Sequence, residues 1–249
     1  MICLYMSIED LAYRILFGCL SNRFKSKAPI SDTMDDPRDD YGPRSTNHSF
    51  YFGICKTQMS KYEKLDSRIK NLRGEQADFE HYSDRWLDYQ SEISGLKRAR
   101  NEAGVIVVVF AAMCLESLIY DYGVSHTSKS YFDRYLDGLS HTKKWVVVPK
   151  ITTGETIDTG GQAFERLQEL VSDRNDLVHD ESTSVPMDDP EELAEWVTER
   201  EEKFARSVPN AMSAIFKVTN ELHSIDPDYP FVSFYDPDSP SNKEFKKYA

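Results

Sequence analysis

Residues 161–179 read GQAFERLQELVSDRNDLVH, and this stretch decides our interpretation of the fold. Its apolar residues recur about every 3.6 positions, which predicts an amphipathic helix: Phe164, Leu167, Leu170, Val171, Leu177 and Val178. The stretch ends in three polar residues, Arg174, Asn175 and His179. Asn175 and His179 are four positions apart and share a helix face. The long side chain of Arg174 reaches back toward the same groove.

These residue types suit phosphate chemistry. Arginine offers a planar, permanently charged fork of donors for phosphate oxygens. Histidine titrates near neutral pH and moves protons, and asparagine orients either partner. A structural interpretation fits the same residues. The helix macrodipole favours a histidine at the C-terminus, and Arg174 has acidic neighbours with which to pair: Asp173, Asp176 and Asp180.

Residues 174–179 resemble the R-N-x-x-x-H signature of the HEPN superfamily (higher eukaryotes and prokaryotes nucleotide-binding domain). Further residues occur in the order found in HEPN proteins of bacteria and their phages: Leu115-Glu116-Ser117, Leu139-Ser140, Lys144-Trp145 and Gly160-Gly161. The resemblance covers about residues 102–222.

The resemblance implies an all-α fold, an HEPN-like helical bundle of about four core helices, here with an N-terminal helical arm. It implies a homodimer and a metal-independent RNA endonuclease of the toxin or antiphage-defence type, with no cofactor. Arg174, Asn175 and His179 would be its catalytic residues. Other members of the superfamily bind partners without cutting RNA. We therefore keep a second hypothesis, a non-catalytic dimeric module that binds a partner protein or antitoxin.

A helix predicted at 102–123 is apolar on all sides between Val105 and Met113, as expected at the centre of a bundle. Glu116 interrupts it. Because a buried carboxylate needs a partner, Arg174 is our candidate. The resemblance implies that Glu116 supports the site. The structural alternatives are a simple Glu116–Arg174 pair and an exposed glutamate at the helix edge.

The net charge of −12 argues against broad nonspecific nucleic-acid binding, which needs a basic surface. It permits a small basic RNA site and a basic protein partner. The candidates for RNA-backbone contacts are Arg98, Arg100, Lys143 and Lys144. Solvated surface cations are the ordinary alternative.

Four cysteines, Cys3, Cys19, Cys55 and Cys114, lack metal-ligand spacing. No Gly-rich phosphate loop and no H-E-x-x-H motif occurs, so we predict neither nucleotide cofactor nor metal. The longest apolar run, 103–115, is too short to span a bilayer, and the N-terminus lacks the basic region of a signal peptide. We expect a cytoplasmic protein without a membrane segment.

The chain divides into five predicted segments. Residues 1–24 are an N-terminal helix and 25–56 an acidic Pro/Gly linker. Residues 57–101 are a charged helical arm or hairpin, in which Gly74 marks either a break between two helices or one glycine tolerated within a helix. Residues 102–224 form the bundle and 225–249 an extended tail. Within the bundle, short helices are predicted at 130–136 and 140–147, with a strand at 145–148 as the alternative. The sequence Asp189-Pro190-Glu191-Glu192 starts a last helix.

Overall fold

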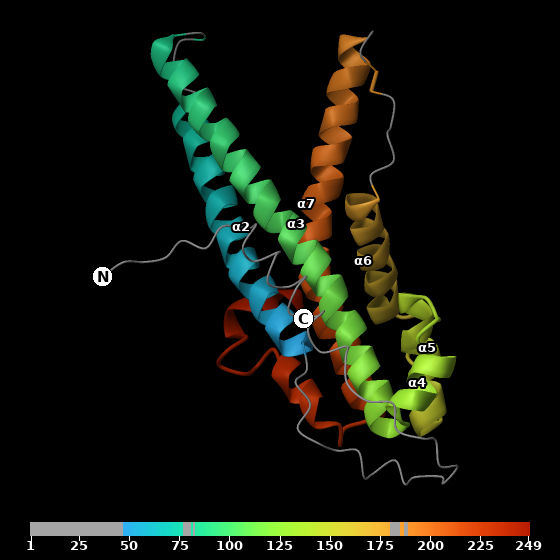
Figure 1. Cartoon of the computed structure of the whole chain (residues 1–249). Helices are drawn as coiled ribbons and strands as arrows, with labels where there is room; N and C mark the ends of the chain where they lie inside the picture. Colours follow the sequence, from blue (N-terminus) through green and yellow to red (C-terminus); the bar gives the residue numbers. More distant parts are fainter. Residues whose placement is uncertain (1–46, 77–80, 82, 180–184, 187–188) are drawn as a thin grey trace, which may run out of the picture. The chain divides into compact units, whose positions relative to one another are not determined.

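A computed structural model describes residues 47–76, 81, 83–179, 185–186 and 189–249 (Figure 1). The predicted N-terminal helix and residues 25–46 of the predicted linker lie outside this range. Within it the chain forms helices and no strand, which confirms the all-α class.

Two long helices, α2 (His48–Gln76) and α3 (Asp84–His126), lie side by side as a hairpin (Figure 1). Ser83 caps α3, since its hydroxyl accepts a hydrogen bond from the Trp86 N–H at 3.2 Å. Ile69, Leu72 and Ile93 form a small separate core at this end. The predicted helical hairpin is thus present, and Gly74 lies within α2, which confirms the alternative of a glycine tolerated in a helix.

Two predicted boundaries are wrong. The linker was expected to reach residue 56, yet α2 begins at His48 and already buries Phe52 and Cys55. A division between arm and bundle was expected at residue 101, yet α3 crosses it without a break. The charged half and the apolar half of the pattern belong to one 43-residue helix. A change from charged to apolar residues therefore marks where neighbours cover the helix, and does not mark its end.

The apolar half of α3 is the central element of the main core, with Val107, Ala111, Leu115 and Leu118 fully buried. Val105 is the exception at 37% exposure. By length and composition α3 is apolar enough to cross a membrane, with a mean hydropathy of 2.2 over its most apolar window. The side chains in 56% of that window are buried inside the protein. The central helix of a soluble bundle has the same properties.

Two short helices follow, α4 (Lys129–Tyr135) and α5 (His141–Thr153). Helix α4 lies close to its predicted bounds of 130–136, whereas α5 continues six residues beyond its predicted end at residue 147. The Ser128 hydroxyl caps α4 by accepting from the Tyr131 N–H at 3.1 Å. Trp145 and Val148 are buried on α5, so the alternative of a strand at 145–148 is wrong. Gly154 ends α5 in the left-handed region at φ 84°, a conformation that favours glycine.

Helix α6 (Gln162–Val178) confirms the helix predicted from residues 161–179, with Leu167 and Leu170 facing the core. Helix α7 (Pro190–Ile225) begins as predicted: the Asp189 carboxylate accepts from the backbone N–H groups of Glu191 and Glu192. Pro209 lies inside α7 and does not end it.

The C-terminal residues are not an extended tail. They form two 3-10 helices, η2 (Pro230–Tyr235) and η3 (Lys243–Tyr248). Tyr235 and Phe245 are buried in the main core, while Phe234 is 56% exposed. The Tyr235 hydroxyl lies 2.7 Å from Nδ1 of His48, so the tail is anchored to the start of α2.

Candidate functional site

The three residues of the R-N-x-x-x-H pattern lie at the C-terminal end of α6. Leu167 and Leu170 bury the preceding turns, which leaves Arg174 half-buried and Asn175 and His179 exposed. His179 is the C-cap residue, and its backbone N–H donates to the Asn175 carbonyl at 2.8 Å. The helix therefore presents its last polar side chains to solvent.

Arg174 is held by an amide. Its Nη1 donates to Oδ1 of Asn175 at 3.0 Å. Its acidic neighbour Asp176 instead pairs with Lys203 of α7, at 2.7 Å. Among the ion pairs of the described residues none includes Arg174.

Glu116 does not join this group. It is exposed on α3 and forms no ion pair with Arg174. The expectation of a buried Glu116 paired with Arg174 is wrong, because Glu116 lies on a side of α3 that faces outward. The alternative of an exposed glutamate describes it.

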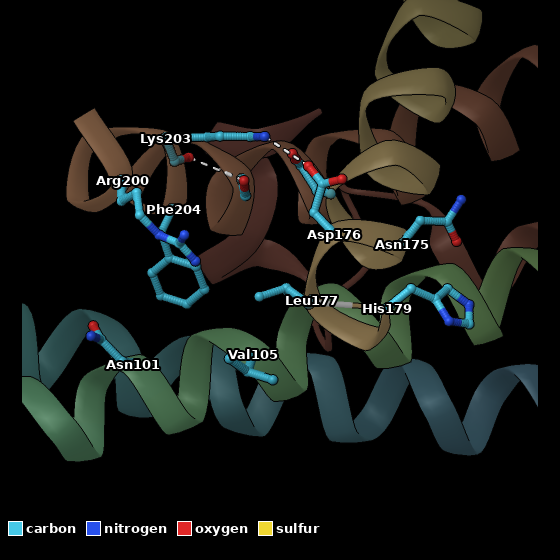
Figure 2. Close-up of a pocket in the computed structure, with 11 residues that line it drawn as sticks. Asn101, Val105, Asn175, Asp176, Leu177, His179, Arg200, Lys203 and Phe204 are labelled. Carbon is cyan, nitrogen blue, oxygen red and sulfur yellow. Dashed lines mark hydrogen bonds and ion pairs between the residues drawn. The ribbon is translucent and has the colours of Figure 1, made fainter. Parts of the chain in front are cut away.

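A cavity of about 760 Å³ opens beside the motif, between α3, the end of α6 and the middle of α7 (Figure 2). Asn175 and His179 belong to its lining, whereas Arg174 does not. The other lining residues are Asn101, Val105, Asp173, Asp176, Leu177, Arg200, Lys203, Phe204 and Ser207. In Figure 2, Asn175 and His179 lie on one side of Leu177, and Arg200 and Phe204 on the other.

The charges around this cavity are mixed. Burial raises the pKa of the Asp173 carboxyl, and a hydrogen bond with Ser207 and the charge of Lys203 oppose that rise in part. Arg200 lies over the ring of Trp196 at 4.8 Å. The positive groups of the cavity are therefore Lys203 and Arg200, each already in contact with a neighbour.

The sequence did not point to Arg200 and Lys203. Their spacing of three places them on one face of α7, but no local pattern tells which helix that face approaches. Four other cations were predicted to contact an RNA backbone. Arg100 pairs with Asp66 at 3.1 Å, and Lys144 is buried with Asp137 at 3.0 Å. Both serve the fold, and Arg98 and Lys143 are exposed outside the cavity.

His141 was also missed. It is the first residue of α5, and its Nε2 is buried without a hydrogen-bond partner. Burial, together with the positive charges of Lys144 and Arg174, lowers its pKa to about 4. His141 is therefore a neutral imidazole that feels the charge of Arg174. The sequence separates the two by 33 residues and gives no signal of this interaction.

Within the described residues no three His, Cys, Asp or Glu side chains gather closely enough to hold a metal ion. Comparison of the chain with protein-family models, with curated proteins and with solved structures gave no match. The interpretation of the site therefore rests on its residues and their geometry.

Proposed function

We propose that the protein is a metal-independent RNA endonuclease of the HEPN type, cytoplasmic and active as a homodimer, with Arg174, Asn175 and His179 as its catalytic residues. One observation supports the proposal: the three residues share the C-terminal end of α6, Asn175 and His179 line an open cavity there, and Arg174 bonds to the Asn175 amide while no carboxylate of the described residues pairs with it. A purely structural arginine at a helix end would be expected to pair with a neighbouring acid.

The proposed reaction needs no group beyond the RNA and the protein. His179 accepts the proton of a ribose 2′-hydroxyl, and the 2′-oxygen attacks the adjacent phosphorus. The bond from phosphorus to the 5′-oxygen breaks, and that oxygen takes up the proton that His179 releases, directly or through solvent, which returns the imidazole to its neutral form. The products are a 2′,3′-cyclic phosphate and a 5′-hydroxyl. Arg174 stabilises the charge that develops on the phosphoryl oxygens, and Asn175 holds the guanidinium in place.

The cavity cations give the RNA backbone a place to bind. Lys203 and Arg200 line the same cavity as His179, and both are exposed. Each phosphate contact made by such a residue weakens with salt. Lys203 must exchange its bond with Asp176 for one with a phosphate, so RNA binding by this site is expected to be modest and strongly salt-dependent.

A non-catalytic interaction module is the second candidate. It is favoured by the two acidic residues, Asp173 and Asp176, that line the cavity beside the motif. Carboxylates at a phosphate site oppose the binding of a polyanion.

Cleavage of an RNA labelled at both ends, in EDTA, tests the proposal. Wild-type protein, His179→Ala, Arg174→Ala and Gln168→Ala are compared, the last being an exposed control on α6. The expected result is cutting by wild type and Gln168→Ala, a loss of at least about 100-fold in the other two, and fragments that end in a cyclic phosphate.

Two results contradict the proposal. One is equal cutting by His179→Ala and Arg174→Ala, which would assign the activity to other residues or to a contaminant. The other is no cutting by folded wild-type protein across RNAs of varied sequence, which would favour the interaction module.

A further inference from the structure

The N-terminal half of α7 lacks the packing that a helix of this kind needs. No residue from 190 to 206 is buried, and Ser207 is the first that is. Most helical stability in proteins comes from packing of an apolar face against other elements. Within the described residues, two ion pairs link this half to its neighbours, Lys97 of α3 to Glu201 at 3.1 Å and Asp176 of α6 to Lys203 at 2.7 Å. Of its apolar side chains, Phe204 packs against the main core, and Leu193, Trp196 and Val197 do not.

This half nevertheless carries an apolar stripe. Leu193, Trp196, Val197 and Phe204 are spaced by three, one and seven positions and lie along one side of the helix. Val197 is 43% exposed, and Leu193 and Trp196 are partly exposed. A stripe with this spacing ordinarily faces another element.

A row of carboxylates borders the stripe. Glu192, Glu195 and Glu199 lie along the neighbouring side of α7, and none of the three has an ion-pair partner among the described residues. Together with Trp196, Val185 and Pro186 they line a second cavity of about 300 Å³. Glu195 and Glu199 are four apart, and like charges at this spacing destabilise an isolated helix. A positively charged neighbour would remove that repulsion.

We propose that this face of α7, formed by Glu192, Leu193, Glu195, Trp196, Val197 and Glu199, is the docking site for a basic amphipathic helix of a partner protein. The partner's apolar side would cover Leu193 and Val197, in the mode of a helix laid against a groove. Trp196 would be the central aromatic anchor. A lysine or arginine of the partner would enter the second cavity and meet the glutamates.

Charge separates this occupant from two others. A second copy docked through the same face would bring the same glutamates against each other, and the whole chain has a net charge of −12. RNA would be repelled for the same reason. A basic polypeptide satisfies both the apolar stripe and the carboxylates. The proposal does not depend on ribonuclease activity, because none of the six residues belongs to the motif or to its cavity.

The test uses the full chain and a fluorescein-labelled synthetic peptide of about 18 residues, with lysine and leucine at helical spacing. A peptide of equal composition in scrambled order controls for charge alone. Fluorescence anisotropy gives Kd for wild type, for Trp196→Ala and for the triple variant Glu192→Gln/Glu195→Gln/Glu199→Gln. The matched triple Glu102→Gln/Glu155→Gln/Glu165→Gln changes the net charge equally at exposed positions elsewhere.

We expect wild type and the matched triple to bind the amphipathic peptide equally. The α7 triple and Trp196→Ala should each bind it at least about tenfold more weakly, and the scrambled peptide should bind more weakly to wild type. Circular dichroism confirms that each variant is folded.

Equal affinities for the two triple variants would overturn the proposal, since the peptide would then follow net charge only. The proposal would also fail if Trp196→Ala converted a wild-type dimer into a monomer and the peptide did not bind. In that case the face belongs to a second copy.

Discussion

At the residue scale, the bond between Arg174 and Asn175 restrains a guanidinium without neutralising it. An amide oxygen accepts one N–H of the fork and leaves the remaining donors and the full charge, which the proposed reaction would use to bind a phosphate. A carboxylate in the same place would compete with the phosphate of the proposed substrate.

Asn175→Ala tests that role. The exposed position predicts a change in the free energy of unfolding within about 0.5 kcal/mol. The freed guanidinium should lower the single-turnover rate of RNA cleavage by about 10- to 100-fold. An unchanged rate would show that Asn175 does not position Arg174.

His141 makes the fold sensitive to acid. Its pKa is about 4 in the folded protein, below the ordinary value near 6.5 of an unfolded chain. The contribution of His141 to the free energy of unfolding is therefore fully present above about pH 6.5. It falls as the pH drops from 6.5 to 4, because in this range only the unfolded chain binds the proton, and it does not change further below pH 4. The difference corresponds to about 3 kcal/mol.

Replacing His141 by leucine should remove the part of the pH dependence of stability that His141 causes. The free energy of unfolding by urea is measured at pH 7.5 and at pH 4.5, and the difference between the two values should become smaller in the variant. The control is Thr142→Ala, a neighbour that does not titrate, which should shift the free energy of unfolding equally at both pH values. His48, whose pKa burial also lowers to about 4, retains its own share. An unaltered pH dependence in His141→Leu would contradict the assignment.

At the element scale, α3 approaches its neighbours most closely at glycines. A Cβ at Gly123 would lie 2.6 Å from Cδ2 of Phe132 and 2.9 Å from Cγ1 of Val148, both buried side chains. Gly95 of the same helix has open space around it. One helix thus contains a glycine that packing requires and one that it does not.

We expect Gly123→Ala to lower the free energy of unfolding by about 1 to 3 kcal/mol through overpacking. Gly95→Ala should raise it by about 0.5 to 1 kcal/mol, because alanine favours a helix. Denaturant unfolding of the two variants measures both. Equal effects of the same sign would show that the close approach at Gly123 is absent in solution.

Helix positions could be predicted from the sequence because periodicity and caps are local. Residues 161–179 and the Asp189-Pro190 start gave their helices directly. The predictions of burial and of side-chain contacts failed because these depend on which helices pack together. The rotation of α3 that exposes Glu116, the burial of Lys144 and the approach of Arg200 and Lys203 to the end of α6 are set by packing between segments far apart in the chain.

At the scale of the whole molecule, the C-terminal residues complete the main core. The Tyr235 hydroxyl lies 2.7 Å from Nδ1 of His48 and 3.4 Å from Sγ of Cys114, and so joins the chain's last segment to α2 and α3. An exposed extended tail would uncover the Phe52 ring, whose centroid lies 4.9 Å from that of the Tyr235 ring.

Tyr235→Phe should lower the free energy of unfolding by about 1 to 3 kcal/mol, because it leaves a buried polar group at His48 without this partner. Thermal unfolding followed by circular dichroism measures the loss. Tyr131→Phe, at a position 41% exposed on α4, is the matched control and should change stability by less than about 0.5 kcal/mol. Similar losses in both variants would contradict the anchoring role of Tyr235.

The two buried cysteines near Tyr235 allow local opening of the core to be measured. Cys55 and Cys114 have no exposed surface, and burial raises the pKa of both thiols, that of Cys114 to about 12. The thiolate is the reactive form, so an alkylating reagent reacts with these sulfurs only when the C-terminal residues detach from the core or the helices separate. The rate at which Cys55 and Cys114 are labelled therefore measures how often this local opening occurs, without any added probe.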